Sequence, residues 1–469
     1  MRTAWAAAAL AAALAIGLSW CIARSPLTLN DGLGPILDSH RSESVRAIFL
    51  SGWYSQGYWR PIRLAQIKMV VDAAPPDATF AFKTIHVALI LALFLLVAAW
   101  LRPRSTAELA AAALALMILV GHHAFFVLYS EAYPINHFLE IAVLAVAVVV
   151  LARGAPRWWK GALAATIVAV GALTVESGLL LGAAAIAGWI VGWRGIPGRG
   201  VLLIAALLAT YFYVRFIALD ISSPGLDERA AGWWLTRLEP PDLIARFGDN
   251  PWPFFSYNVI AAFLDVLASE PRGGMLQITR SVLGDDARPW MLIHVASSLL
   301  LTGAMVLALP QAVSRWRAGR LDDRDRFLLL AVMMVAANSV MSFGYVKDEV
   351  LSVGAVFYAG GAFAVLATLG DRAAERLSLR AVAAAMTLLV VSVLWSSRAA
   401  GTFFSLERSA YKTASDWAGY SLERESPADW SLESARQAYL AIRQRSLRGD
   451  VPHPRFTQQQ RVDRYLEIQ

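Results

Sequence analysis

The sequence predicts an all-α polytopic membrane protein, and its composition and apolar patterning support that fold class. Hydrophobic residues make up 57% of the 469 residues and charged residues only 16%, whereas about a quarter of the residues of a soluble protein are charged. The 17 Trp and 13 Tyr also fit a membrane protein, because their rings favour the interface between lipid and water. The apolar residues are gathered in long runs, so we expect helices that cross a bilayer.

A transmembrane helix needs about 20 mostly apolar residues, and about eleven runs in the chain approach that length. A shorter run, 253–268, carries an aspartate and is interpreted as an interfacial or re-entrant helix. Residues 1–22 predict an uncleaved anchor rather than a signal peptide, because the apolar run is long and CIARSP is a poor cleavage site. The candidate spans are 4–22, 85–101, 107–127, 138–152, 161–175, 178–193, 201–218, 290–310, 327–343, 350–369 and 381–397.

The distribution of Lys and Arg predicts the orientation of these spans. With the N-terminus and Arg2 in the cytoplasm, every linker expected inside is rich in arginine, as cytoplasmic loops are. The short linkers expected outside are nearly free of basic residues: 130–136, Glu176–Ser177 and 345–349. The linkers expected inside are 102–104, 153–160, 193–199, 315–326 and 371–380.

This orientation predicts a multi-pass membrane domain, 1–397, followed by a polar extracytoplasmic tail, 398–469, with a helix around WSLESARQAYLAIRQRSL. Two long loops, a large first loop at 23–84 and another at 219–289, also lie on the extracytoplasmic side. The abundance of Ala and Arg is typical of a GC-rich bacterial genome. We therefore expect the inner (plasma) membrane of a bacterium.

Several classes of function are excluded by what the chain lacks. The net charge of +7 does not indicate nucleic-acid binding, because the basic residues are confined to short linkers. A single cysteine, Cys21, excludes a disulfide framework and a multi-cysteine metal site. The phosphate-binding, dinucleotide, metalloprotease and serine-hydrolase motifs are missing, so the sequence does not indicate a nucleotide-driven pump.

The first loop carries several candidate site residues. Asp31, in LNDGLGP, is a candidate general base or metal ligand near a phosphate, or simply an Asx-turn residue before glycine. Asp38 is a weaker candidate, since DSHRSES also resembles a helix N-terminus. In YWRPI, Pro61 keeps the chain extended and could present Arg60 to a phosphate. Tyr58 and Trp59 are then interfacial anchors that line the site, or the whole segment is only an anchor.

Polar residues at helix ends extend the candidate set. Ionisable groups in spans are costly and usually face a cavity or a partner. Glu176 lies in a tight turn between two spans, and Arg215 either binds a lipid phosphate or extends its charge to the interface. The His122–His123 pair reads as core or interfacial histidines rather than as a chelating pair, because adjacent helical residues point about 100° apart. Further candidates are His86, Glu131 and Lys347.

The order of these motifs resembles the GT-C superfamily of integral membrane glycosyltransferases, in its protein O-mannosyltransferase-like branch. The motifs are Asp31 after the first span, YWRPI (58–62), FKTIH (82–86), GHHAFFVLYSEAYPINHFLE (121–140), LTVESGLLLGAA (173–184) and GYVKDEVLSVGAVFYAGG (344–361). The resemblance covers about residues 1–370. It implies a GT-C-like architecture and a transferase that takes a sugar from a polyprenyl-phosphate donor and passes it to an extracytoplasmic protein or glycan acceptor.

The same resemblance assigns roles to residues. Asp31 falls at the position of the family's catalytic acid, and Arg60, Arg215 and Lys347 are candidate ligands of the donor phosphate. Asp38, Tyr58, Trp59, His86, His123, Glu131 and Glu176 are candidate site-lining residues. A divalent metal is possible, but no ligand set is assigned. The partners implied are the lipid-linked sugar, membrane lipid and the acceptor, without nucleic acid.

Two other classes of function stay open. One is a transporter or flippase of a lipid-linked saccharide, although no internal repeat of the kind found in transporters is visible. The other is a non-catalytic envelope scaffold that binds a partner through its tail. The scaffold is favoured by the first-loop acidic motif, which is reduced here to Asp31 followed by Gly32.

Overall fold

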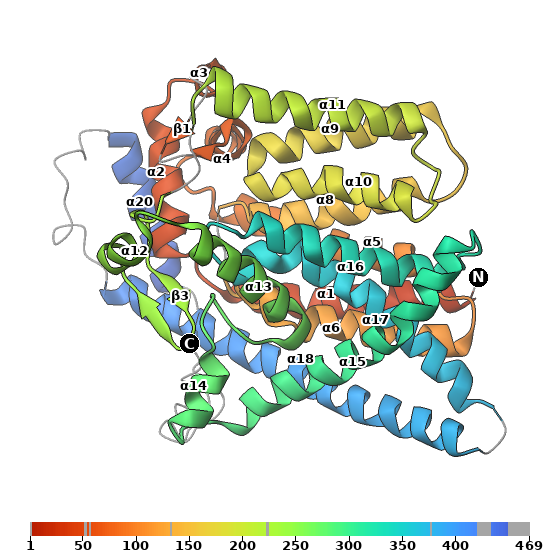
Figure 1. Ribbon diagram of the computed structural model, residues 1–469. Helices are drawn as coiled ribbons and strands as arrows, with labels where there is room; N and C mark the ends of the chain where they lie inside the picture. Colours follow the sequence, from red (N-terminus) through yellow and green to blue (C-terminus); the bar gives the residue numbers. More distant parts are fainter. Residues whose placement is uncertain are drawn as a thin grey trace.

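The computed structural model shows an elongated bundle of helices with smaller helices and two hairpins gathered at one end (Figure 1). It describes residues 2–50, 54–55, 58–131, 134–221, 225–375, 378–419 and 433–448. About 79% of these described residues are helical. The all-α fold class is therefore confirmed.

Six helices in the described part of the chain are long and apolar enough to cross a membrane. A seventh span is possible if a bent pair, α6 (Thr106–Gly121) and the segment His123–Ser130, is counted as one, with a bend of 59° between its halves. The six are α1 (Arg2–Arg24), α5 (Thr79–Leu101), α11 (Gly198–Tyr213) with its extension η4 (Val214–Ala218), α15 (Pro289–Arg317), η5 (Asp348–Leu351) with α17 (Ser352–Ala373), and α18 (Leu379–Gly419).

Shorter or more polar helices complete the bundle. Each of the eleven apolar runs named above lies mainly on helix, but 107–127 is interrupted at His122, and the number of complete crossings remains a prediction. The 253–268 run lies on a helix whose C-terminal half is packed inside the bundle, with Asp265 and Val266 fully buried. These helices are α8 (His137–Ala152), α9 (Trp158–Thr174), η3 (Glu176–Gly178) with α10 (Leu179–Ile190), α13 (Trp252–Ala268) and α16 (Asp323–Met341).

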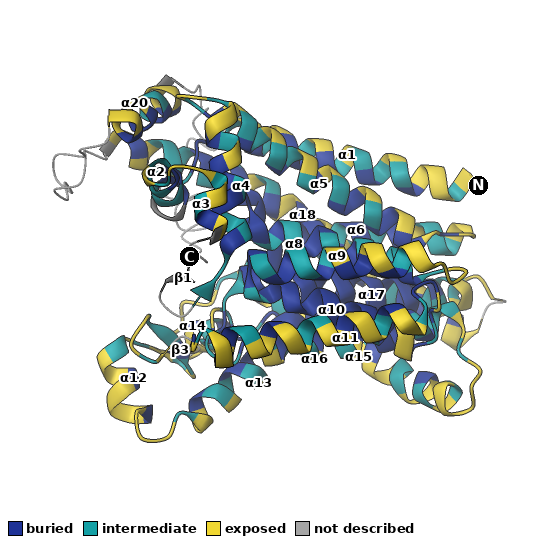
Figure 2. Ribbon diagram, turned by 90° about the horizontal axis from the view of Figure 1, so that it is seen from above, coloured by how far each residue is buried: buried dark blue, intermediate teal, exposed yellow. Residues whose placement is uncertain are grey.

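The centre of the bundle is α17, whose apolar segment is entirely buried (Figure 2). Its sequence, SVGAVFYAGGAFAVLATL, is apolar on every side, and a helix of that kind is stable only when it is surrounded. Glycines allow close neighbours: a Cβ at Gly360 would lie 2.3 Å from the ring of Trp100. Around α17, the outer helices such as α11 and α15 expose apolar residues, as helices facing lipid do.

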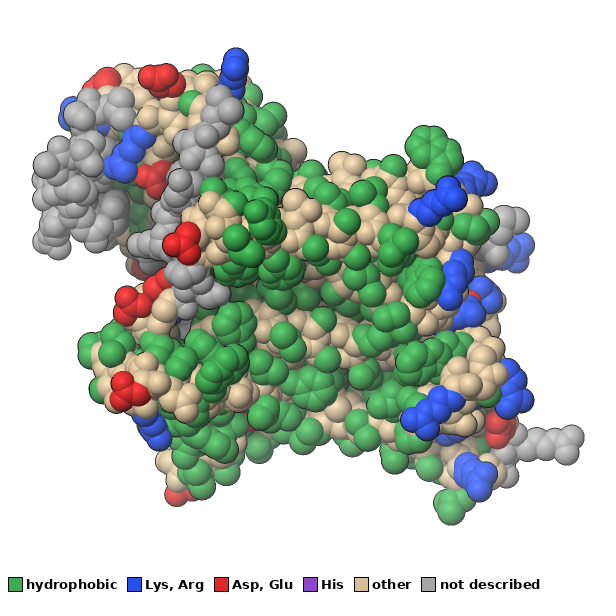
Figure 3. Space-filling view, turned by 45° about the horizontal axis from the view of Figure 1, so that its top comes forward, with side chains coloured by type: hydrophobic (Ala, Val, Ile, Leu, Met, Phe, Trp, Pro, Cys, Tyr) green, Lys and Arg blue, Asp and Glu red, His purple; other side chains and the backbone are tan. Residues whose placement is uncertain are grey.

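The two long loops lie at the end of the bundle opposite the N-terminus (Figure 1). We call this the loop end. Lys and Arg side chains gather at the other end, beyond a broad apolar surface (Figure 3). The first loop contains η1 (Leu29–Leu33), α2 (Gly34–Arg41), α3 (Val45–Leu50), the strands β1 (Tyr54–Ser55) and β2 (Tyr58–Trp59), and α4 (Pro61–Ala73). The second long loop contains β3 (Ala231–Trp233), β4 (Thr236–Leu238), α12 (Pro240–Phe247), α13 and α14 (Gln277–Leu283).

Each hairpin is a two-stranded antiparallel pair, with Tyr54 opposite Trp59 in one and Trp233 opposite Thr236 in the other.

Between the spans, the bent region after α6 contains η2 (His123–Phe125) and α7 (Phe126–Ser130). These short elements cover the loop end, where the helix ends of the bundle carry most of the candidate site residues.

The tail begins inside a helix rather than after one. We placed its start at 398, whereas α18 continues without a break to Gly419 and reaches the first loop, where Trp417 Nε1 donates to the carbonyl of Leu27 at 2.7 Å. The helix expected around WSLESARQAYLAIRQRSL is α20 (Glu433–Arg448), which packs on α2 and α18. The described part of the tail is therefore attached to the first loop.

Candidate functional site

A pocket at the loop end brings together four of the candidate residues, Tyr58, Arg60, Glu176 and Arg215, from distant parts of the chain. Its cavity volume is about 140 Å³, and we call it the arginine pocket. Arg60, Glu176 and Arg215 form its polar side. Its full lining is Tyr58, Arg60, Phe138, Glu176, Ser177, Leu179, Tyr211, Phe212, Arg215, Phe216, Met341, Phe343, Gly344, Tyr345 and Val350.

Glu176 lies between the two arginines. Arg60 Nε donates to Glu176 Oε2 at 2.8 Å, and Arg60 Nη2 donates to the same oxygen. Arg215 Nη1 donates to the other oxygen, Oε1, at 3.3 Å and to the hydroxyl of Tyr211 at 3.1 Å. One negative charge therefore compensates two guanidinium groups, which leaves a formal charge of +1 on this group of three side chains.

Proline places Arg60 at the pocket. Pro61 is the first residue of α4, a position that proline favours because the missing N–H is not needed there. Arg60 itself is not helical, as expected for a residue before proline. The expectation that Pro61 keeps the chain extended at Arg60 is met only in part, because φ is −134° but ψ is 55°, well short of an extended value.

A tight turn places Glu176. The helix α9 ends at Thr174, Val175 is extended, and Glu176 begins the short η3 before α10. The turn passes so close to α9 that a Cβ at Gly178 would lie 2.0 Å from the carbonyl oxygen of Gly171. A residue with a side chain does not fit there, so Gly178 allows the approach that brings Glu176 to the pocket.

A turn of π-helix, which is wider than a turn of α-helix, brings Arg215 to the pocket. The last turn of α11 is a π-helical segment, η4, in which the Leu219 N–H donates to the carbonyl of Val214 at 2.9 Å. Such segments occur frequently at functional sites. The Arg215 side chain is only 4% exposed, although its neighbours on the outer face of the helix are exposed. It therefore points into the protein and does not extend to the interface.

Aromatic rings surround the arginines. The Arg60 guanidinium lies 4.0 Å from the centre of the Tyr58 ring, and Arg229 donates to the Tyr58 hydroxyl. Trp59 stacks on Tyr211 with ring centres 5.5 Å apart. Trp59 thus packs against a residue of the pocket wall, without lining the cavity itself.

The electrostatics keep the pocket cationic. Burial alone would lower the pKa of Arg60, but the charge and hydrogen bonds of Glu176 outweigh burial and raise it. Burial is also the main cause that raises the pKa of Tyr58, so its hydroxyl stays protonated as a hydrogen-bonding group. Arg60 is therefore positively charged at every physiological pH.

The rest of the pocket lining is mostly apolar, and two of its residues are partly exposed on the surface. Phe212 and Phe216, on α11 and η4, are 46% and 39% exposed, on a helix whose apolar segment is only 17% buried. Phe138, Leu179, Met341, Phe343 and Val350 complete the apolar lining. The pocket thus combines two guanidinium groups with apolar side chains, of which Phe212 and Phe216 are exposed on the surface of the bundle.

Other predicted site residues lie outside the arginine pocket. The side chain of Asp31 lies outside the described residues. Asp38 is half exposed and pairs with Arg41 at 3.1 Å, on α2. Lys347 forms an ion pair with Glu349 and does not line the pocket, and Glu131 follows the end of α7.

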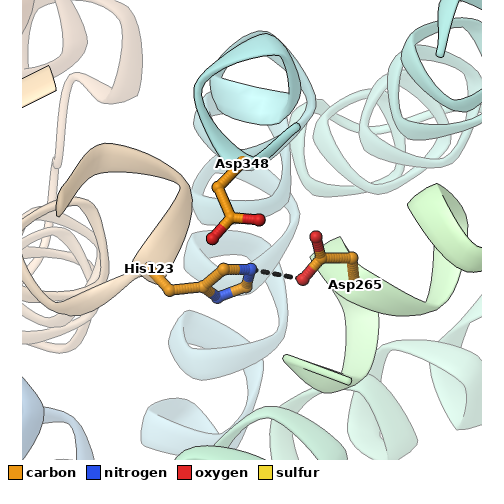
Figure 4. Close-up of side chains that lie close together, drawn as sticks. All are labelled: His123, Asp265 and Asp348. Carbon is orange, nitrogen blue, oxygen red and sulfur yellow. Dashed lines mark hydrogen bonds and ion pairs between the residues drawn. The ribbon is translucent and has the colours of Figure 1, made fainter. Parts of the chain in front are cut away.

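Two predicted site residues are buried histidines. His86 Nε2 lies 2.8 Å from the carbonyl oxygen of Leu128, a contact that joins α5 to α7. His123 lies in a separate buried cluster with Asp265 and Asp348 (Figure 4). Their ligand atoms lie within 4.8 Å of one another, and this is the one such metal-compatible group among the described residues.

Sequence reasoning did not select Asp265, Arg229 or Tyr211. A signal existed for Asp265, since it is the lone charge within an apolar helix and such residues usually have a partner. Arg229 belongs to a loop in which nothing distinguishes one arginine from another. Tyr211 looks like any aromatic residue near a membrane interface.

Comparisons with protein-family models, with curated proteins and with solved structures find no match to this chain.

Proposed function

We propose that this protein is a membrane glycosyltransferase of the GT-C type that uses a polyprenyl-phosphate sugar as donor. The observation that carries the proposal is the arginine pocket, in which Arg60 and Arg215 share the lining with apolar residues, among them the partly exposed Phe212 and Phe216. A polyprenyl phosphate has the same two parts, an anionic head and an apolar chain. The ordered motifs of the sequence support the same assignment.

The chemistry of the pocket suits the leaving group of such a reaction. When the sugar is transferred, negative charge increases on the lipid phosphate, and guanidinium groups stabilise that charge through paired N–H donors. Glu176 holds the two arginines in place. Because each guanidinium has five N–H donors, both arginines can bind a phosphate with the donors that Glu176 does not use. Tyr58 and Tyr345 supply aromatic surfaces on the side of the first loop.

Asp31 is the proposed general base toward the acceptor hydroxyl. It follows α1 in the first loop, in η1, the segment that precedes α2 at the loop end. Its role rests on the sequence motif alone. The phosphate-binding role of Arg60 and Arg215 and the base role of Asp31 are therefore tested separately.

The test uses the full chain in lipid nanodiscs with polyprenyl-phosphate sugars. We expect release of sugar by the wild-type protein, weaker donor binding in Arg60→Gln and Arg215→Gln, and retained binding without transfer in Asp31→Asn. Each lost charge-assisted contact weakens donor binding by about tenfold or more. Arg237→Gln is the matched control, because this arginine is in a loop-end hairpin with its side chain 69% exposed.

The arms of this experiment separate the competing functions. Donor binding that depends on Arg60, without release of sugar from any donor and with movement of the lipid across the bilayer, would assign a flippase instead. Failure of every polyprenyl-phosphate sugar to bind would reject a lipid-linked donor altogether. Equal binding by wild type, Arg60→Gln and Arg215→Gln would reject the arginine pocket as the phosphate site.

A further inference from the structure

A second group of chemically active side chains lies in the interior, apart from the arginine pocket. His123 comes from η2, Asp265 from α13 and Asp348 from η5, so three segments far apart in the chain meet (Figure 4). We propose that these three side chains bind a divalent first-row transition-metal ion, Zn²⁺ or Mn²⁺. The proposal does not depend on the function proposed above.

The first argument is the polar atoms that the cluster leaves unsatisfied. His123 is 6% exposed and Asp265 is fully buried. His123 Nε2 contacts Asp265 Oδ1 at 2.5 Å, while Asp265 Oδ2 has no hydrogen-bond partner among the described residues. A buried carboxylate oxygen without a partner destabilises the folded state. A cation between the three side chains would bind both carboxylates and the imidazole nitrogen at once.

The second argument is that nearby arginines do not neutralise these carboxylates directly. No ion pair within 4.0 Å joins Arg272 or Arg398 to Asp265 or Asp348 in the described part of the chain. Arg398 instead donates to the hydroxyls of Ser269, Ser297 and Ser298 and to the carbonyl of Gly121.

The other arginine is also engaged elsewhere. Arg272 Nη2 contacts His294 Nδ1, and its guanidinium lies 5.4 Å from the centre of the Trp290 ring. Asp348 Oδ1 accepts a backbone hydrogen bond, from the Gly273 N–H at 3.2 Å. Among the described residues, His123 is the side chain that contacts Asp265 at hydrogen-bond distance, while Arg272 acts on both carboxylates through its charge without a direct ion pair.

The neighbouring histidine is not part of the proposed site. His122 Nε2 donates to the carbonyl of Val266 at 3.1 Å, and its Nδ1 accepts the Ala124 N–H at 3.2 Å. One ring nitrogen therefore bonds the backbone at the break between α6 and η2, and the other bonds the backbone of α13. That leaves His123 as the histidine whose ring turns toward the carboxylates, with the two rings stacked 4.6 Å apart.

The ligand types select the class of metal. An imidazole nitrogen with two carboxylates suits zinc, manganese and similar ions, whereas Mg²⁺ and Ca²⁺ prefer oxygen ligands alone. Three protein ligands leave positions for water or for a further ligand, as in catalytic rather than closed structural sites. Cys21, the single cysteine, is on α1 and takes no part.

A bound ion would fasten the second long loop to the bundle beside the arginine pocket. Asp265 is near the C-terminal end of α13. Asp348 lies in the sequence between Tyr345 and Val350, two residues that line the pocket. The metal would therefore fix the wall of the pocket that η5 provides. We expect removal of the metal to lower thermal stability even where no substrate is present.

The test is metal stoichiometry on the full-length protein in nanodiscs. Protein treated with chelator is reloaded with ZnCl₂ or MnCl₂, freed of excess metal by gel filtration, and analysed by mass spectrometry of its metal content. We expect about one ion per wild-type chain and a rise in Tm on loading. We expect His123→Gln and Asp265→Asn to lose at least about nine-tenths of the metal and the rise in Tm.

Glu270→Gln is the matched control, because Glu270 is a partly buried carboxyl close in sequence that accepts the Ile278 N–H instead. It should keep the metal. Asp348→Asn, at a partly exposed ligand, replaces Asp265→Asn if that variant does not fold. X-ray absorption of the zinc-loaded wild type should show one nitrogen ligand of imidazole type together with oxygen ligands.

Three results would overturn the proposal. The first is folded wild-type protein that takes up neither ion, which would leave a proton shared between the two carboxyls. The second is equal uptake by wild type and by all three ligand variants, which would place the metal elsewhere. The third is a zinc spectrum without an imidazole ligand.

Discussion

Arg60 and Glu176 lie 116 residues apart in the chain, and Arg60 Nε donates to Glu176 Oε2 at 2.8 Å. Arg215 binds the other oxygen of the same carboxylate. The ion pair therefore ties the first loop to the turn after α9 and to the end of α11. All three side chains are largely buried, with exposed fractions of 12%, 19% and 4% for Arg60, Glu176 and Arg215.

We expect Glu176→Gln to destabilise the protein, because it leaves two buried arginines without their shared carboxylate. Breaking a buried ion pair in this way costs roughly 3 kcal/mol. The measurement is the free energy of unfolding in detergent micelles. Asp38→Asn is the control, since the Asp38–Arg41 pair is about half exposed and such pairs contribute less than about 1 kcal/mol.

A double-mutant cycle then isolates the pair. Adding Arg60→Gln to Glu176→Gln should cost less than Arg60→Gln costs in the wild type, because the partner is already gone. Additive effects of the two substitutions would show that the pair contributes no coupling energy and that each residue acts through other contacts.

Gly178→Ala should be among the most damaging of single-methyl additions. Its Cβ would lie 2.0 Å from the carbonyl oxygen of Gly171, a backbone atom that cannot move without shifting α9. Overpacking of this kind costs about 1–3 kcal/mol or more, and it would also displace Glu176. Unfolding in micelles measures the loss.

Gly401→Ala provides the comparison for this substitution. A Cβ at Gly401, within α18, would meet no atom within 4 Å. Replacing a helical glycine by alanine stabilises by up to about 1 kcal/mol. If both alanine variants had the same free energy of unfolding, that result would contradict the close approach of the η3 turn to α9.

The helices could be predicted from the sequence because the length of an apolar run can be read from neighbouring residues alone. Each apolar run named from the sequence lies mainly on helix, and one of them, 107–127, contains a break. The break after Gly121 could not be foreseen in the same way, since GHHAFF is apolar enough to continue a span. It depends on His122, whose ring bonds the backbone of both Ala124 and Val266, and Val266 belongs to a helix much later in the chain.

The arginine pocket was predictable in part. The YWRPI segment indicates Arg60, and the cost of a charge at a helix end indicates Glu176 and Arg215, but their mutual contact depends on how three distant segments pack. Lys347 has the same sequence signal and lies outside the pocket, paired with its near neighbour Glu349. Sequence alone does not distinguish a charge with a local partner from a charge that faces a distant one.

A third prediction concerns Glu270 and the pH dependence of stability. Burial raises the pKa of Glu270 from 4.5 to about 6, against hydrogen bonds from the backbone of Ile278 and Thr279. Between these pH values the folded protein holds a proton that the unfolded chain has lost. Stability is therefore highest below the unfolded pKa, falls as pH rises toward about 6, and is level above it.

A shift of this size corresponds to at most about 2 kcal/mol. Because the side chain is partly exposed to water, we expect about 1 kcal/mol. Glu270→Gln should gain that amount relative to the wild type between acid and neutral pH, as measured by unfolding across the range. Glu239→Gln, at a site 62% exposed, should show no such difference. A flat difference curve for Glu270→Gln would contradict the shifted pKa.

The last prediction tests the attachment of the tail to the first loop. Tyr439 and Ile442 of α20 are buried, at 2% and 1% exposed, in one cluster with Leu27, Ile36 and Trp417. Removing a buried aromatic side chain costs about 3–5 kcal/mol. In Tyr439→Ala this loss falls on a short helix that has few other contacts, so α20 should detach while the bundle stays folded.

Hydrogen exchange measures this detachment directly. Loss of about 3 kcal/mol would reduce the protection of the α20 amides by about 10²-fold, with little change in α17. Leu440→Ala is the control on the same helix, because Leu440 is 51% exposed and points away from the cluster. Equal protection of α20 in the two variants would mean that burial of Tyr439 does not hold the tail to the first loop, and the helix would then depend on the ion pair between Arg445 and Asp77.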